Sequence, residues 1–238
     1  MAASSSENPL PRVTTRSLQK ISKDGANISM LTAYDYPTAE VLDEAGIDIL
    51  LVGDSLAMVV QGHDTTLPVP LDDMIYHAKM VGRAAKRAMV VVDLPFPEGQ
   101  LEIIRSVEAG ARVLKESTCH AVKLEGGAEQ AKRIETIVTA GIPVMAHVGL
   151  RPQNIHVDGG YRVQRDMPTL IEDAIAAEQA GAFAVLVECV PSDLGQAITE
   201  AINVPTIGIG AGPHLTGQVL VTPLSLIHIS EPTRPERR

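Results

Sequence analysis

Short runs of aliphatic and β-branched residues alternate with longer stretches of helical period from Ser29 onward. A short apolar run bounded by turn residues is typical of a buried strand, and strands alternating with amphipathic stretches are typical of βα units and a parallel sheet. The pattern predicts strands at residues 29–34, 49–53, 89–93, 121–125, 143–147, 184–189 and 205–210, with the start of an eighth at 218–221. Helices are predicted at residues 37–45, 71–85, 100–116, 128–140, 167–180 and 192–202.

This repeat predicts an α/β fold, a (β/α)8 TIM barrel that forms one domain over residues 28–223. The alternative is an open doubly wound sheet, which more often carries a glycine-rich phosphate loop after its first strand, and Tyr34-Asp-Tyr-Pro37 is not one. A glycine-rich run, Gly208-Ile-Gly-Ala-Gly212, does follow the seventh predicted strand. It indicates either a phosphate site or a close backbone approach, and we favour the second.

The two ends of the chain differ in composition from the middle. Residues 1–27 are interpreted as a flexible tail and lead-in, because the first part is rich in Ser, Thr, Pro and Arg and lacks the apolar core of a secretory signal. A targeting segment is the lesser alternative, since Glu7 is present and no amphipathic face is clear. Residues 224–238 change abruptly to Ser, Pro and Arg and are interpreted as a non-native tail, so the barrel is expected to lack its last helix.

Charge and hydrophobicity argue against two classes of partner. The formal net charge of -9 at pH 7 argues against a nucleic-acid surface, which is usually basic. No apolar run reaches the roughly 18 residues of a membrane span. Cys119 and Cys189 lie in different predicted elements without metal-ligand spacing, so we expect reduced thiols in a cytosolic protein.

Two opposite charges interrupt the apolar run Ala121-Val-Lys-Leu-Glu-Gly-Gly127. Positions two apart on a strand face the same way, so Lys123 and Glu125 are expected to point together to one side. Burying a charged pair on a strand destabilises the fold, so such a pair indicates a functional requirement at that place. The end of a strand is also where catalytic groups of α/β barrels lie.

Three consecutive predicted strands end in an acid, namely Asp54, Asp93 and Glu125. Neighbouring strands lie about 4.8 Å apart, so acids at the same level on adjacent strands are expected to converge. Such a cluster repels itself unless a cation or proton lies among its members, and ligands that are all oxygen suit Mg²⁺. The alternative is that each acid caps the helix or loop that follows it.

Two further strand ends carry candidate groups. His147 is expected either to contact a substrate or to be a structural histidine with internal partners. Glu188 follows the apolar run 184–187, and burial there would raise its pKa and make it a capable general base. An ordinary surface salt bridge is the alternative for Glu188.

Eight short motifs occur in a characteristic order over residues 28–221. They are Gly53-Asp-Ser55, Gln61-Gly-His-Asp64, Asp93-Leu-Pro-Phe96, Lys123-Leu-Glu-Gly-Gly127, His147-Val-Gly-Leu150, Gly159-Gly-Tyr161, Glu188-Cys-Val-Pro191 and Gly208-Ile-Gly-Ala-Gly212. The set closely resembles the ketopantoate hydroxymethyltransferase family. The resemblance implies a barrel of the phosphoenolpyruvate/pyruvate type, a Mg²⁺ site, and transfer of a hydroxymethyl group from 5,10-methylenetetrahydrofolate to 2-oxoisovalerate in pantothenate synthesis. It also implies a cytoplasmic homo-oligomer, commonly a decamer.

Residue by residue, the resemblance implies roles for the same strand ends. It places Asp54, Asp93 and Glu125 at the metal and Glu188 as the base. The substrate-binding residues are expected to be Asp54, Ser55, Asp93, Lys123 and His147.

The chain departs from the family pattern in two places. Residues 97–100 read Pro-Glu-Gly-Gln where a Gly-Ser-Tyr type of loop is usual, and the family sequence continues where residues 224–238 stand. The second departure leaves an inactive truncated subunit open as an alternative to the transferase. A related Mg²⁺-dependent lyase acting on 2-oxo acids also stays open, because it would share the metal and enolate chemistry.

Overall fold

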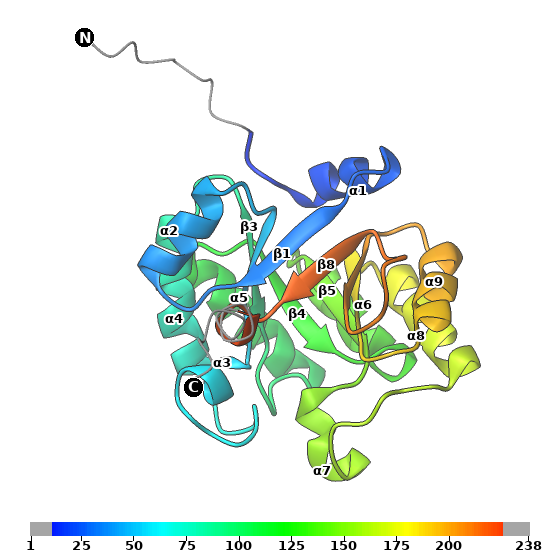
Figure 1. Ribbon diagram of the computed structural model, residues 1–238. Coiled ribbons are helices and arrows are strands. Elements are labelled where there is room, and N and C mark those ends of the chain that lie inside the picture. Colours follow the sequence, from blue (N-terminus) through cyan, green and yellow to red (C-terminus); the bar gives the residue numbers. More distant parts are fainter. Residues whose placement is uncertain (1–10, 226–238) are drawn as a thin grey trace, which may run out of the picture.

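The computed structural model describes residues 11–225, which form a closed barrel of eight parallel strands (Figure 1). Each strand pairs with the next along the chain, and β8 closes the ring against β1. The strands are β1 (Ile28–Thr32), β2 (Ile49–Val52), β3 (Met89–Asp93), β4 (Ala121–Glu125), β5 (Val144–Gly149), β6 (Ala184–Glu188), β7 (Thr206–Ile209) and β8 (Gly217–Leu220). The predicted (β/α)8 barrel is confirmed.

Helices surround the barrel, and the six predicted from the sequence are all present, with boundaries shifted by up to three residues. They are α2 (Tyr36–Glu44), α4 (Leu71–Ala84), α5 (Ile103–Ser117), α6 (Ala131–Thr139), α8 (Met167–Gln179) and α9 (Ser192–Ala201). Shorter elements lie in the loops and at the amino end, namely α1 (Thr15–Lys23), α3 (Leu56–Val59), η1 (Ala128–Gln130), η2 (Pro152–Asn154) and α7 (Ile155–Asp158). None of the helices in this described part is long and apolar enough to cross a membrane.

The strands separate two apolar cores because successive side chains point to opposite faces of the sheet. On β4, Val122 and Leu124 belong to the outer core between the sheet and the helices. The barrel interior holds a second cluster, which includes Met30, Leu51 and Met145. Burial on both faces explains why most strands read as unbroken apolar runs in the sequence.

Helix α1 lies at one end of the barrel, opposite the end where α3 and α7 lie (Figure 1). Thr14 caps it by accepting a hydrogen bond from the Ser17 N–H, and the Ser17 hydroxyl accepts one from the Thr14 N–H. Val13 and Leu18 join the apolar cluster of the barrel interior, and Leu18 is fully buried. The interpretation of residues 1–27 as a flexible lead-in is therefore wrong for this helix, while residues 1–10 lie outside the described part.

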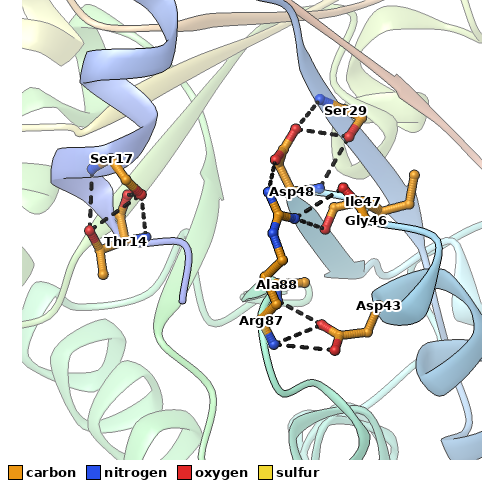
Figure 2. A network of polar contacts seen from close by, with 9 residues as sticks. All are labelled: Thr14, Ser17, Ser29, Asp43, Gly46, Ile47, Asp48, Arg87 and Ala88. Atoms are coloured by element: carbon orange, nitrogen blue, oxygen red, sulfur yellow. Dashed lines mark hydrogen bonds and ion pairs between the residues drawn. The ribbon is translucent and has the colours of Figure 1, made fainter. Parts of the chain in front are cut away.

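Figure 2 shows a polar network that ties α2 to the amino ends of β2 and β3. The Asp43 carboxylate accepts hydrogen bonds from the backbone N–H groups of Arg87 and Ala88. The Arg87 guanidinium in turn lies 2.8 Å from Asp48, whose other oxygen accepts from the N–H and hydroxyl of Ser29. These contacts hold α2 and the amino ends of β1, β2 and β3 together at the end of the barrel opposite the strand carboxyl ends.

The glycine-rich run after β7 passes closely beside α9. A side chain on Gly212, which has a φ of +86°, would meet the Ser192 hydroxyl at 2.3 Å. The interpretation of this run as a close backbone approach therefore has a direct structural basis.

The outer faces of β1 and β8 border an open groove of about 760 Å³. Ser29, Leu31, Gln218 and Leu220 line it, and Leu220 is half exposed. The expectation that the barrel lacks its last helix concerns residues after Ser225 and lies outside the described part of the chain.

Candidate active site

A cavity of about 240 Å³ opens at the carboxyl ends of the strands. The seven residues singled out from the sequence all line it, namely Asp54, Ser55, Asp93, Lys123, Glu125, His147 and Glu188. They come from five consecutive strands or from the loops directly after them. The structure therefore brings together every predicted site residue at the end of the barrel where catalytic groups of this fold lie.

Lys123 and Glu125 both point into the barrel, as the spacing of two predicted. Lys123 Nζ lies 3.0 Å from Asp93 Oδ1, and these two side chains are 6% and 4% exposed. Burial pulls the pKa of Lys123 down, but the charges of the surrounding carboxylates raise it above its usual value. Lys123 is therefore a charged ammonium in the middle of the acids.

The expectation that the three acids lie at one level is wrong. The strand register pairs Asp93 with Lys123 and Glu125 with His147. Strands of a closed barrel are staggered, so a residue at the end of one strand lies beside an earlier residue of the next. As a result Asp93 is next to a cation, and Glu125 reaches further toward the mouth.

Asp54 lies just after β2 and its backbone N–H donates to Asp93 Oδ2 over 3.0 Å. Burial raises the pKa of Asp54 to about 7, and the nearby charge of Asp93 adds to the shift. The next residue, Ser55, has its hydroxyl 2.8 Å from that of Tyr34. Ser55 is thereby fixed at the rim of the cavity.

The two carboxylate oxygens of Glu125 differ in their contacts. Oε2 accepts from the Gln153 N–H over 3.1 Å, while Oε1 is buried and has no hydrogen-bond partner among residues 11–225. Burial raises the pKa of Glu125 well above its usual value, and the charge of Asp54 adds to this. Gln153 also donates from Nε2 to Asp54 Oδ2 over 2.9 Å.

His147 links the lysine to Glu188. Its Nδ1 lies 3.3 Å from Lys123 Nζ and its Nε2 lies 3.2 Å from Glu188 Oε2. Burial, followed by the charge of Lys123, lowers the pKa of His147, so the ring is neutral at pH 7. An ammonium can only donate, which leaves Nδ1 as acceptor and the ring proton on Nε2, facing Glu188.

Glu188 ends β6 beside the cavity, but its side chain is 22% exposed. The burial expected from the preceding apolar run is therefore only partial, because the last position of the strand already faces the open mouth. Its neighbour Cys189 has a φ of 50°, which turns the chain sharply after the strand. Glu188 is thus accessible to a molecule in the cavity while remaining in contact with His147.

Some buried polar atoms at the cavity lack a hydrogen-bond partner within residues 11–225. They are Glu125 Oε1 and Thr66 Oγ1, both on residues that line the cavity. Buried polar groups in folded proteins are usually satisfied, so these atoms indicate a polar ligand. The site thus has a carboxylate oxygen and a hydroxyl group left to bind a ligand in the cavity.

The acids of the cavity offer only oxygen atoms to a cation. In the described part of the chain, no three His, Cys, Asp or Glu side chains are already arranged as a ligand set. Mg²⁺, however, usually binds one or two carboxylates and keeps several waters. The oxygen-only donors suit such an ion, and so do the raised pKa values of Asp54 and Glu125, which result from burial and, to a lesser extent, from the charges of neighbouring acids.

A model of the ketopantoate hydroxymethyltransferase family matches residues 12–236. The chain belongs to the ketopantoate hydroxymethyltransferase family. The match extends past residue 223 and so includes most of residues 224–238, which had been interpreted as a non-native tail.

Individual relatives agree with this assignment. The chain is 70% identical over 217 residues to the 3-methyl-2-oxobutanoate hydroxymethyltransferase of Rhodopirellula baltica, a match that covers 91% of this chain and 81% of the relative. It is 55% identical over 211 residues to the enzyme of that name from Desulforapulum autotrophicum, covering 89% and 80%. The chain is accordingly an enzyme of the ketopantoate hydroxymethyltransferase family.

Solved structures with little sequence identity share the fold. A phosphonopyruvate hydrolase complexed with oxalate and Mg²⁺ superimposes with a TM-score of 0.70 at 13% identity, covering 91% of this chain and 84% of the hydrolase. A 2,3-dimethylmalate lyase of the PEP mutase/isocitrate lyase superfamily gives 0.66 at 18% identity, covering 92% and 85%. These proteins share the barrel fold of this ketopantoate hydroxymethyltransferase family member.

Gln153 and Tyr34, which contact site residues, were not predicted from the sequence. Gln153 lies in the short η2 turn after β5, and Tyr34 lies after β1. Neither residue belongs to a pattern of charges or to a periodic pattern of apolar residues. The only signal for Gln153 was its place a few residues after the His147-Val-Gly-Leu150 motif.

Proposed function

We propose that this enzyme transfers a hydroxymethyl group from 5,10-methylenetetrahydrofolate to 3-methyl-2-oxobutanoate (2-oxoisovalerate) and forms 2-dehydropantoate. The observation that carries the proposal is the convergence of Asp54, Asp93, Lys123, Glu125 and Glu188 on one cavity. The family and the names of the relatives support the same reaction. We place the enzyme in the pathway of pantothenate synthesis on these grounds.

The cavity suits a branched 2-oxo acid in both its polar and its apolar part. A 2-oxo acid carries a carboxylate and a keto oxygen, which the Lys123 ammonium and the Ser55 hydroxyl are placed to bind. Leu51, Leu186 and Ile209 line the same cavity and offer an apolar surface to the isopropyl group. The substrate would therefore lie with its charged end toward β4.

Asp54 and Asp93 would hold Mg²⁺, with Glu125 in support. When bound, Mg²⁺ supplies a Lewis acid that polarises the keto oxygen of the substrate and stabilises negative charge developing there. Lys123 compensates the charge of Asp93 and keeps the site from being overly negative. His147, as a neutral donor at Nε2, would hold the Glu188 carboxylate in position.

Glu188 would act as the general base that removes the proton from C3 of the substrate. The electron pair of the C3–H bond then moves into the enolate, and C3 forms a new bond to the one-carbon unit of the folate. That carbon is bonded to two nitrogens in the folate and to a hydroxyl in the product. The overall transfer therefore consumes one water and releases tetrahydrofolate.

Product formation tests this proposal directly. The enzyme is incubated with 2-oxoisovalerate, 5,10-methylenetetrahydrofolate and Mg²⁺, and 2-dehydropantoate is measured by mass spectrometry. We expect product only when all three are present, and none after chelation of the metal. Cleavage of a 2-oxo acid without folate would instead indicate a lyase, and a folded chain without turnover would indicate an inactive subunit.

A further inference from the structure

Gln153 reaches three strand ends of the site from the short turn after β5. Its Nε2 donates to Asp54 Oδ2 over 2.9 Å and to the carbonyl of Leu94 over 3.0 Å. Its backbone N–H donates to Glu125 Oε2 over 3.1 Å. Asp54 follows β2, Leu94 follows β3 and Glu125 ends β4, so one buried residue connects all three.

A second glutamine fixes which way the Gln153 amide points. Gln100 Nε2 donates to Gln153 Oε1 over 2.7 Å. The carbonyl of Leu94 can only accept, so the nitrogen of the Gln153 amide must face Leu94 and Asp54, and its oxygen must face Gln100. Gln100 belongs to residues 97–100, the segment in which the sequence departs from the family pattern.

A neutral donor has a particular advantage at this place. Asp54 and Glu125 are both buried, and carboxylates at one site repel each other, so they move apart unless a donor holds them. A lysine or arginine in the position of Gln153 would neutralise them. An amide orients the carboxylates and leaves their full negative charge for a cation.

We propose that Gln153 is a positioning residue for the metal site, which holds Asp54 and Glu125 at the geometry that binds Mg²⁺, and that Gln100 fixes its amide. This inference rests on the proposed function, because it takes these two acids as metal-binding residues. Gln153 is not among the residues that line the cavity, so it acts through the acids rather than on a substrate.

Mg²⁺ calorimetry without substrate tests the role, using the purified chain. Gln153→Met keeps the length of the side chain and the backbone N–H to Glu125 but removes the amide. Loss of a group that hydrogen-bonds to a metal ligand typically lowers metal affinity by about 10–100-fold. We expect a loss of that size, together with a fall in kcat that higher Mg²⁺ concentrations restore. A residue that only stabilises the loop would lower the melting temperature and leave the Mg²⁺ affinity unchanged.

Two further variants keep the test decisive. Gln100→Met leaves the Gln153 amide in place but removes the hydrogen bond that orients it, so we expect a smaller loss of Mg²⁺ affinity. This variant still tests the inference if Gln153→Met does not fold. Gln196→Met removes an exposed amide on α9, which donates to Glu200, and should leave affinity and activity unchanged. Unchanged Mg²⁺ affinity in both Gln153→Met and Gln100→Met, beside a clear loss in Asp54→Ala, would overturn this inference alone. No Mg²⁺ binding by the unsubstituted chain would overturn the proposed metal site, and this inference with it.

Discussion

Lys123 Nζ and Asp93 Oδ1 lie 3.0 Å apart and form an ion pair closed off from solvent at the centre of the cavity. Removing one partner of a buried pair leaves an uncompensated charge and destabilises a protein by about 3–5 kcal/mol. We expect Lys123→Met to lower the free energy of unfolding by an amount in this range, measured by urea denaturation. In the double variant Lys123→Met, Asp93→Asn the loss should be smaller than the sum of the two single losses. Simple additivity would show that the two groups do not stabilise each other.

Glu188 is expected to carry the proton-transfer step. The exchange of the C3 hydrogen of 2-oxoisovalerate for deuterium, followed by NMR without folate, isolates this step. Removal of a general base typically slows a reaction by about 10²–10⁴-fold, so Glu188→Gln should exchange more slowly by that factor. Glu200→Gln, on the exposed face of α9, is the matched control and should exchange at the normal rate. Normal exchange in Glu188→Gln would assign the base to another group.

Mg²⁺ binding should depend on Asp54 and Asp93. Titration of the ion into the unsubstituted chain by calorimetry is expected to give a clear binding curve, and the double variant Asp54→Ala, Asp93→Ala should give none. Asp193→Ala removes an exposed acid from α9 and is expected to bind as the unsubstituted chain does. Undiminished affinity in the double variant would place the metal elsewhere.

Asp43 is expected to contribute to stability without contributing to catalysis. Its carboxylate accepts from the backbone N–H groups of Lys86, Arg87 and Ala88, and each buried donor left without a partner destabilises the fold by about 1–3 kcal/mol. Asp43→Ala should therefore lower the free energy of unfolding by several kcal/mol, while kcat per folded molecule stays the same. Asp72→Ala, which removes an exposed ion pair with Arg112, should change stability by no more than about 1 kcal/mol. Similar losses in the two variants would show that the hydrogen bonds of Asp43 do not contribute more to stability than an exposed ion pair does.

The stability of the fold should fall at alkaline pH because of Cys119. Burial raises the pKa of its thiol from 9.0 to about 11. Since the unfolded chain loses this proton first, the thiol's contribution is intact below pH 9 and is lost as the pH rises from 9 toward 11. The difference in unfolding free energy between the unsubstituted chain and Cys119→Ser, followed over this range, should shrink with pH. A difference that stays constant with pH would show that Cys119 does not titrate differently in the two states.

The sequence predicts the barrel and the residues around its mouth because both depend on local patterns. Strands buried on two faces read as apolar runs, and a charge such as Lys123 or Asp93 stands out against them. The strand order then brings the ends of neighbouring runs together.

Other features depend on the closed ring as a whole. The stagger that pairs Asp93 with Lys123 is set by the shear of the barrel, which no single strand encodes. The contacts of Gln153 in the site depend on the path of the loop after β5, whose sequence has no hydrophobic periodicity from which that path could be predicted. Helix α1 buries Leu18 fully and Ile21 only in part, so its sequence has few of the repeated apolar positions that predict a docked helix.

That docked helix also has a consequence for the order of assembly. Leu18 shares its buried cluster with Met30 of β1 and with Val219 of β8, the first and last strands of the ring. The apolar surface that α1 packs against is thus complete only after the ring has closed, although α1 is synthesised before any strand. We therefore expect α1 to dock late in folding, after β8 has paired with β1.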